Sequence, residues 1–552
     1  MWSSVLSVLG LVVCLVVGTY FYIARKEEAN KWKIKVVKVE EEQHDINDND
    51  EKIGGENTGI PSEDNKEAKP IFKTPQPKPI KELLFWNTVE SIAYNFMTPE
   101  HPAVVVHKQA VLKHNYQPLL GYLMSFPYVV FSTPSAARVL TMNWREIEKE
   151  NTRLFSPDIH KFMGLNLVFA NGDEWKRQRT VVNPAFKDIS RFMGAFVKNA
   201  FKAVQVFSEL NQSGKELIVD PSDMTGRLAL DVLGMTVFGV NFNTISALSP
   251  LHTKTNESEK VAKALKSYQY VMDNIANPVR FLAGKYFADW NIESNIKMNN
   301  NIAAFQSFLD ELIEDCKNKK DYQNNTLLKM MVDSVDEEGN GMSIQDIKNN
   351  TSVFFLAGTE TTAAALAFIF YSLATNPRVQ EKLYQEIIET FPLDQDETQF
   401  NNYEKVKDMK YLDAVLKENL RLFPPVPQLP LRILNSTTVI DGYKIPKGFA
   451  VNLSVYSVHR HPEVWGEDAE EFKPERFLEK RYPSFAWIPF GSGARKCIGN
   501  QFSMMEQKTF VIALLRKYKI ELERPDQVLK LNKLRPNMSP DSSNKYRLVE
   551  RK

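Results

Sequence analysis

Near the C-terminus the chain reads Phe490-Gly491-Ser492-Gly493-Ala494-Arg495-Lys496-Cys497-Ile498-Gly499, and this stretch decides the fold. Its glycines let the backbone turn tightly and approach a flat ligand closely. Arg495 and Lys496 are expected to favour the ionised form of the Cys497 sulfur, and Phe490 is expected to keep water away from it. The pattern over 502–515 predicts a helix, which would place the sulfur near a helix N-terminus, where anions are stabilised. A thiolate in such surroundings suits a single axial bond to the iron of heme.

A lone cysteine in a glycine-rich loop is more often a buried structural thiol, and only the whole stretch reverses that interpretation. The stretch resembles the heme-binding loop of the cytochrome P450 family at every signature position. The resemblance extends over about 83–548 and includes further motifs in the family's order. It implies a P450 fold, heme b (iron protoporphyrin IX) as the cofactor, Cys497 as the axial ligand of its iron, and Phe490 and Gly491 as residues of the heme-binding loop.

Composition excludes several other classes of protein. The 552 residues carry a formal net charge of +1, so no overall nucleic-acid-binding character is visible. The cysteines are Cys14, Cys316 and Cys497, which indicate neither a disulfide framework nor a zinc cluster. A reducing compartment is therefore expected for the catalytic part.

The N-terminal segment 5–24 is uncharged and mostly apolar, and about 20 such residues suffice to cross a bilayer. A cleaved signal peptide is the alternative, but no basic stretch precedes the segment. Positive charges follow it, beginning with Arg25 and Lys26, and are expected to stay cytosolic. We therefore predict a transmembrane signal anchor over 1–24, in a single-pass protein of the endoplasmic reticulum membrane with a cytosolic catalytic domain.

The anchor is followed by a segment without globular character. Residues 25–80 are first basic, then polar and acidic, and then rich in proline, which predicts a disordered tether and a stiffer hinge. Microsomal members of the resembled family usually have a shorter hinge with a Pro-Gly pair, which this chain lacks. Residues 81–552 are predicted to form one catalytic domain.

Within that domain the pattern is mainly helical with a small β-sheet region. Strands are expected over 128–132 and 436–446, the latter with a turn at Asp441-Gly442. Helical periodicity is strongest over 178–210, 223–238, 261–275, 292–316 and 344–374.

A polar run, Ala357-Gly358-Thr359-Glu360-Thr361-Thr362, interrupts the apolar helix predicted over 353–373. A packing glycine and an exposed polar face would explain it without function. Gly358 would also let a planar ligand lie against the helix, and a threonine hydroxyl can hold a water beside bound dioxygen. By resemblance to the family's acid–alcohol motif, Thr361 and Glu360 are the catalytic pair that delivers protons, and Ala357 and Gly358 contact the heme.

Further acidic and basic residues match motifs of the same family. Glu418 and Arg421 are three apart and would alone be an ordinary surface pair. With Arg476, the resemblance implies a buried structural triad that braces the heme loop.

Trp175 and Arg179 lie four apart on one predicted helix face, and both donate hydrogen bonds suited to carboxylates such as heme propionates. This pair matches the family's propionate-binding helix. Arg495 and Arg432 are further candidates for the propionates, although a purely structural ion pair is a rival interpretation for Arg432.

The resemblance implies a monooxygenase that inserts one atom of O₂ into a lipophilic substrate. Electrons would come from NADPH through NADPH-cytochrome P450 reductase, with cytochrome b5 as a further possible donor, and Lys176, Arg177 and Lys496 would face this acidic partner. Membrane lipids are expected partners and nucleic acid is not. The substrate pocket is expected from 155–169, 353–364 and 425–430. Two alternatives stay open: a peroxide-dependent isomerase or dehydratase that needs no reductase, and a non-catalytic heme-binding protein.

Overall fold

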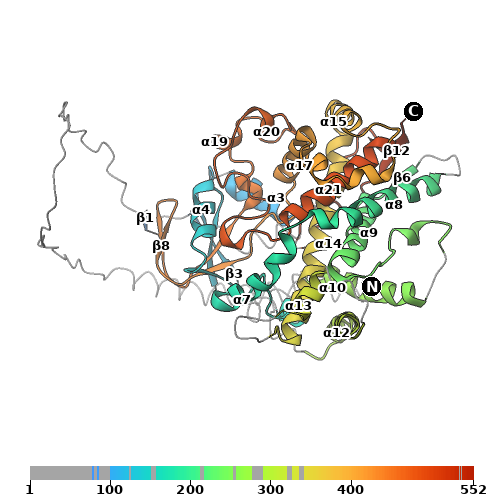
Figure 1. Ribbon diagram of the computed structural model, residues 1–552. Coiled ribbons are helices and arrows are strands. Elements are labelled where there is room, and N and C mark those ends of the chain that lie inside the picture. The colour runs from blue at the N-terminus through green and yellow to red at the C-terminus, as the bar shows by residue number, and fades with distance from the viewer. Residues whose placement is uncertain are drawn as a thin grey trace, which may run out of the picture. The chain divides into compact units, whose positions relative to one another are not determined.

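The longest helix of the computed structural model, α14 (Ile344–Ala374), runs through the middle of the described helices (Figure 1). Ser343 caps it, because its hydroxyl accepts a hydrogen bond from the Asp346 N–H at 3.0 Å. Helix α9 (Pro221–Leu233) packs along α14. A Cβ on Gly358 would lie 2.6 Å from a methyl carbon of Leu233, so the glycine permits this close approach.

The structure describes residues 78–79, 84–85 and 100–551, without 113, 124–125, 151–156, 212–216, 253–255, 276–289, 320–325, 335–340, 534 and 536. From Lys78 onward these residues form one compact unit. The predicted anchor over 1–24 lies outside the described residues, as does the predicted tether over 25–80 except for 78–79.

Helices dominate the described residues, which confirms the predicted fold class. Besides α9 and α14 they are α3 (Pro102–Val106), α4 (Pro134–Met142), α6 (Pro157–Met163), α7 (Gly172–Val182), α8 (Met193–Asn211), α10 (Asn256–Ile275), α12 (Glu293–Asn318), α13 (Leu327–Val332), α15 (Pro377–Thr390), α16 (Tyr403–Lys407), α17 (Lys410–Leu422), α18 (Val455–Val458), α19 (Pro462–Trp465), α20 (Arg476–Glu479) and α21 (Asn500–Lys517).

The predicted helix over 223–238 corresponds to α9 followed by a π-helical turn, Gly234–Phe238. The other predicted helices agree with these bounds except in one place. The prediction of one helix over 178–210 is wrong, because α7 ends at Val182 and α8 begins at Met193. Two short 3-10 turns, Asn183–Phe186 and Ser190–Phe192, separate them. Pro184 explains the break, since proline donates no backbone hydrogen bond and clashes with the preceding turn of a helix.

The strands form small sheets at the margin of the helices. They are β1 (Lys78–Pro79), β2 (Leu84–Phe85), β3 (Leu119–Leu123), β4 (Phe126–Phe131), β5 (Ile147–Lys149), β6 (Leu217–Val219), β7 (Arg432–Leu434), β8 (Thr438–Ile440), β9 (Tyr443–Ile445), β10 (Ala450–Leu453), β11 (Tyr518–Leu522) and β12 (Tyr546–Glu550). The largest sheet has the order β2-β3-β4-β10-β7-β5. In it, β10 pairs in parallel with β4 and antiparallel with β7, and β7 pairs antiparallel with β5. Arg432 of β7 therefore stands opposite Val451 of β10 and Lys149 of β5.

The turn predicted at Asp441-Gly442 is present between β8 and β9. Both residues have positive φ, at 50° and 78°, which is the conformation required by a tight two-residue hairpin turn. Strand β4 likewise covers most of the predicted strand over 128–132.

Two large apolar clusters lie on α14. One contains Leu366 and joins α14 to α8, α17 and α21. The other contains Phe355 and joins α14 to α10 and α12. Helix α14 is also long and apolar enough to cross a membrane, but 67% of its most apolar window is buried, so it is a core helix here.

Candidate active site

The loop that carries Cys497 is closed by its own backbone. The Cys497 N–H donates a hydrogen bond to the carbonyl oxygen of Phe490 at 2.8 Å. Gly491 and Gly493 have φ of 65° and 67°, a conformation that L residues with side chains rarely adopt. At Gly493 a Cβ would lie 2.5 Å from the carbonyl oxygen of Thr141 in α4, so no larger residue fits there. The loop therefore holds Cys497 in one fixed place.

Cys497 is a free thiol that precedes α21, as predicted. The residue keeps accessible surface, yet protein surrounds the sulfur densely enough that burial raises the pKa of the thiol above its ordinary value. The Gly499 N–H, Arg179 and Lys496 act in the opposite direction. Lys496 thus acts in the direction that the sequence predicted, but burial outweighs it.

Arg495 does not turn to the sulfur. Its Nη2 atom donates to the carbonyl oxygen of Ala170 at 2.6 Å and to Oδ1 of Asn171 at 3.1 Å. Its guanidinium carbon lies 4.3 Å from the ring centre of Trp175. The loop thus brings Arg495 to the helix that carries Trp175 and Arg179.

The arginines predicted to bind the propionates, Arg179, Arg432 and Arg495, lie in one region, and their positive charges repel one another. Burial, and then the charges of Arg432 and Arg179, lower the pKa of Arg495 to about 9. Burial lowers the pKa of Arg432 to about 10, and this residue is only 5% exposed. Among the described residues, Nε of Arg432 and both Nε and Nη1 of Arg495 are buried without a hydrogen-bond partner.

Buried N–H groups normally have partners, so these donors indicate a missing acceptor. The missing group must be anionic, because it has to offset clustered guanidinium charges. Heme b supplies anionic acceptors, since its two propionates are carboxylates. Its iron also accepts a thiolate such as Cys497. The residues present therefore fit this group.

The threonine hydroxyls of the polar run 357–362 in α14 make different contacts. The Thr361 hydroxyl donates to the carbonyl oxygen of Ala357 at 2.7 Å, and Ala357 itself is exposed. The Thr359 hydroxyl bonds the carbonyl oxygen of Phe355. Thr362 instead leaves the helix and contacts the Ser503 hydroxyl in α21 at 2.9 Å. Because its proton is committed to Ala357, the Thr361 oxygen is left to accept a hydrogen bond.

Gly358 has the packing role that the sequence offered as an alternative. Its missing side chain makes room for Leu233 of α9. Its contact with heme stays a prediction.

Glu360 has partners on both carboxylate oxygens. The Tyr268 hydroxyl, from α10, donates to Oε1 at 3.0 Å. Arg535, near the C-terminus, donates from Nη1 to Oε2 at 2.8 Å. The second nitrogen of this guanidinium, Nη2, contacts Oδ1 of Asp273 at 2.9 Å.

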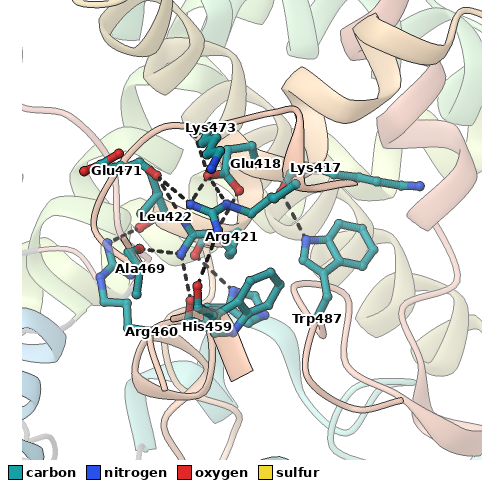
Figure 2. A network of polar contacts seen from close by, with 12 residues as sticks. Lys417, Glu418, Arg421, Leu422, His459, Arg460, Ala469, Glu471, Lys473 and Trp487 are labelled. Carbon is teal, nitrogen blue, oxygen red and sulfur yellow. Dashed lines mark hydrogen bonds and ion pairs between the residues drawn. The ribbon is translucent and has the colours of Figure 1, made fainter. Parts of the chain in front are cut away.

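Glu418 and Arg421 form a fully buried ion pair (Figure 2), and the buried Arg476 also pairs with Glu418. Nε and Nη2 of Arg421 donate to the two Glu418 oxygens at 2.7 and 2.8 Å, and Nε of Arg476 donates to Oε1 at 2.9 Å. Arg421 also donates to the carbonyl oxygens of His459, Ala469 and Glu471. All five N–H donors of Arg421 therefore have acceptors, as a buried guanidinium requires.

His459 connects this cluster to the loop of Cys497. It is buried with 0% exposure, its Nδ1 lies 3.1 Å from the carbonyl oxygen of Arg421, and its Nε2 lies 2.9 Å from the N–H of Ile488. A carbonyl oxygen can only accept and an N–H can only donate, so the ring is neutral with its proton on Nδ1. Nearby, Nε1 of Trp487 donates to the carbonyl oxygen of Lys417 at 3.1 Å and ties the same segment to α17.

The basic residues predicted to lie on the side of Cys497 differ in whether they are exposed or already paired. Lys176 and Lys496 are exposed. Arg177 contacts Glu174 at 2.8 Å and Asp346 at 2.9 Å, so its charge is largely neutralised within the protein.

Sequence patterns leave His459 as a surface or core residue and do not single out Tyr268 or Arg535. Tyr268 is 92 positions from Glu360 in sequence, and Arg535 is 175 positions away. No spacing rule links residues so distant, so only the folded chain reveals these contacts.

Comparison with known proteins gives a consistent result. A family model described as cytochrome P450 matches residues 94–546. Cytochrome P450 4V2 of Pongo abelii is 29% identical over 447 residues, which cover 76% of this chain and 80% of that protein. Cytochrome P450 3A18 of Rattus norvegicus is 28% identical, with 77% and 84% covered. Cytochrome P450 3A28 of Bos taurus is 30% identical, with 68% and 73% covered.

Proposed function

The chain belongs to the cytochrome P450 family and is a heme-thiolate monooxygenase with heme b as its cofactor, and from this premise we propose that it oxidises a lipophilic substrate with electrons that NADPH supplies through NADPH-cytochrome P450 reductase. Cytochrome b5 would be an additional electron donor. The observation that carries the site assignment is the fixed thiol of Cys497 beside buried arginine donors that lack an acceptor.

Within this proposal each site residue has a stated task. Cys497 would hold the heme iron, and bound heme would supply the activation of dioxygen. The propionates would accept hydrogen bonds from Trp175, Arg179, Arg432 and Arg495. Contacts with the heme would come from Phe490 and Gly491 of the loop and from Ala357 and Gly358 of α14. Glu418, Arg421 and Arg476 brace the loop through His459 and Ile488.

The proton path is assigned to Glu360 and Thr361. The Thr361 hydroxyl is oriented by the Ala357 carbonyl oxygen, so its own oxygen accepts a hydrogen bond from water in the site. Glu360, one residue earlier, exchanges protons with solvent and passes them to this water. Retention of both residues favours oxygen insertion over the isomerase or dehydratase reaction and over heme binding without catalysis.

The electron-transfer partner is proposed to dock on the side of Cys497. Lys176 and Lys496 are exposed and would attract an acidic surface. Arg177 contributes less, because Glu174 and Asp346 already pair with it.

One assay separates the three candidate functions. The heme-loaded full chain is incubated with a lipophilic library, NADPH and the reductase under ¹⁸O₂. Product that contains one ¹⁸O atom and requires the reductase supports the monooxygenase. Turnover of lipid peroxides without reductase would support the isomerase or dehydratase. Full heme occupancy without any product would support a binding protein.

Membrane attachment belongs to the same proposal. Residues 1–24 would anchor the protein in the endoplasmic reticulum membrane, 25–80 would act as a tether, and 81–552 would be the cytosolic catalytic domain. Deletion of 1–69 is expected to release the protein from membranes while heme binding is retained. Full retention of the truncated protein on membranes would contradict the anchor.

A further inference from the structure

Asn171 stands at the N-cap of α7 but does not cap that helix. Its backbone is extended there, with φ of −121° and ψ of 169°, and its side chain makes no capping bond to the first turn of α7. An asparagine at an N-cap normally accepts a hydrogen bond from the second or third helical N–H, and loss of such a cap costs about 1 kcal/mol. Asn402 shows the ordinary arrangement at the start of α16, where its side chain accepts from the Lys405 N–H at 3.0 Å. The Asn171 side chain therefore has a different use.

The Asn171 amide is bonded to strand β5 instead. Its Oδ1 atom accepts from the Lys149 N–H at 2.9 Å, and its Nδ2 atom donates to the Lys149 carbonyl oxygen at 3.0 Å. The amide thus pairs with both backbone groups of one residue, as a residue of a neighbouring antiparallel strand would. These two bonds fix the orientation of the side chain and therefore the position of Oδ1.

The same Oδ1 atom also accepts from Nη2 of Arg495 at 3.1 Å. Nη2 carries two N–H groups, and the second acceptor is the Ala170 carbonyl oxygen at 2.6 Å. The guanidinium carbon lies 4.3 Å from the ring centre of Trp175. These contacts hold the guanidinium in place through one nitrogen and one face. Its other donors, Nε and Nη1, are the buried ones that have no acceptor among the described residues.

We propose that Asn171 is a positioning residue for the cofactor: it holds Arg495 in a fixed relation to β5, so that Nε and Nη1 are available to a heme propionate. A neutral amide suits this task, because it orients the guanidinium without neutralising its charge. A carboxylate at position 171 would pair with Arg495 and compete with the propionate. The inference rests on the propionate role proposed for Arg495.

Two substitutions separate positioning from a merely structural bond. Asn171→Ala removes the acceptor and the tie to β5, so the full-length holoenzyme should lose heme to an excess of a heme-scavenging protein about tenfold faster, the equivalent of one charge-assisted hydrogen bond. Asn171→Asp keeps acceptor oxygens and adds a partner for Arg495, so its heme-free chain should unfold at a higher temperature than that of Asn171→Ala. It should nevertheless lose heme at least as fast. A merely structural role would make heme loss follow stability.

Coupling to Arg495 is the second readout. If Asn171 acts through Arg495, neither substitution at 171 should speed heme loss further in an Arg495→Leu background, whereas both should do so in an Arg432→Leu background. Asn402→Ala, which removes an ordinary cap, is the control and should lower stability without changing heme loss.

The outcomes decide between the two assignments. Additive effects in the Arg495→Leu background, or heme loss that follows stability, would overturn the positioning role of Asn171. If Asn171→Ala does not fold, the effect of Asn171→Asp in the Arg495→Leu background decides alone. A parent-like rate of heme loss in Arg495→Leu itself would instead reject the propionate role of Arg495, and the inference with it.

Discussion

The imidazole of His459 accepts a hydrogen bond from the backbone N–H of Ile488 at 2.9 Å. Ile488 stands directly before Pro489 and Phe490, where the loop of Cys497 begins. The other ring nitrogen of His459 binds the backbone of Arg421. One buried ring therefore connects the Glu418 ion cluster to the segment that positions the sulfur.

His459→Phe keeps a planar aromatic ring but removes both hydrogen bonds. The Ile488 N–H and the Arg421 carbonyl oxygen would then be buried without partners, at about 1–3 kcal/mol each. We expect a lower melting temperature and a smaller fraction of reduced, CO-bound protein with the red-shifted Soret band of a thiolate-ligated heme. His252→Phe, on a half-buried ring far along the chain from this cluster, is the control. A parent-like thiolate fraction in His459→Phe would show that the ring does not position the loop.

Glu418→Gln removes the carboxylate that pairs with both buried arginines of the cluster, Arg421 and Arg476. Breaking a buried pair in this way is expected to lower the free energy of unfolding by about 3–5 kcal/mol. Denaturant titration measures it. Glu404→Gln provides a matched control, because Glu404 forms the same i,i+3 contact with Lys407 at the surface and should change stability by less than about 1 kcal/mol. Equal effects of the two substitutions would contradict the prediction.

Arg432→Leu and Arg495→Leu should separate heme affinity from protein stability. Both guanidinium groups carry buried donors without acceptors in the described structure. Their removal should therefore weaken heme binding while leaving the stability of the heme-free protein unchanged or higher. Heme titration and thermal unfolding of the heme-free protein test the two parts. Arg378→Leu, on an 80% exposed side chain, should change neither.

Thr361→Ala should uncouple oxygen consumption from product formation, because it removes the hydroxyl that accepts hydrogen bonds in the site. The ratio of product formed to NADPH consumed measures the effect. Thr375→Ala is a close control: the Thr375 hydroxyl makes the same bond to a carbonyl oxygen four residues earlier, at 2.7 Å, but at the exposed end of α14. Unchanged coupling in Thr361→Ala would reject its role.

Acid should destabilise the fold through its buried histidines. Burial, and then the charge of Arg421, lower the pKa of His459 to about 3, and burial lowers the pKa of His101 and His107 to about 4. The unfolded chain takes up protons first, near pH 6.5, so the histidine contribution to stability is complete above that pH and is lost as the pH falls toward 4.

Buried carboxyl groups change the free energy of unfolding with pH in the opposite direction. Burial raises the pKa of Glu150 to about 7 and that of Glu506 well above its ordinary value, so both favour the folded state at low pH. The histidine effect is therefore measured as a difference: the free energy of unfolding should depend less on pH between 6.5 and 4 in His459→Gln than in the parent chain. Parallel pH profiles would contradict it.

The success of sequence-based prediction varied with the range of the interaction. Helix α14 was predictable because its periodicity is local, and the turn at Asp441-Gly442 because two residues specify it. The break between α7 and α8 required attention to Pro184. The packing partner of Gly358, Leu233, belongs to another helix, and the restraint of Glu360 depends on Arg535, so neither contact has a local signature. Arg495 illustrates the same limit, since neighbourhood in sequence to Cys497 did not predict that its guanidinium turns to Ala170.

The hydrogen bond between Thr362 and Ser503 joins α14 to α21. Helix α14 carries Thr361, and α21 begins at Asn500, three residues after Cys497. This cross-link therefore couples the helix that carries the proposed proton-delivering residues to the helix that follows the thiol, and a wider spacing of the two helices would break it.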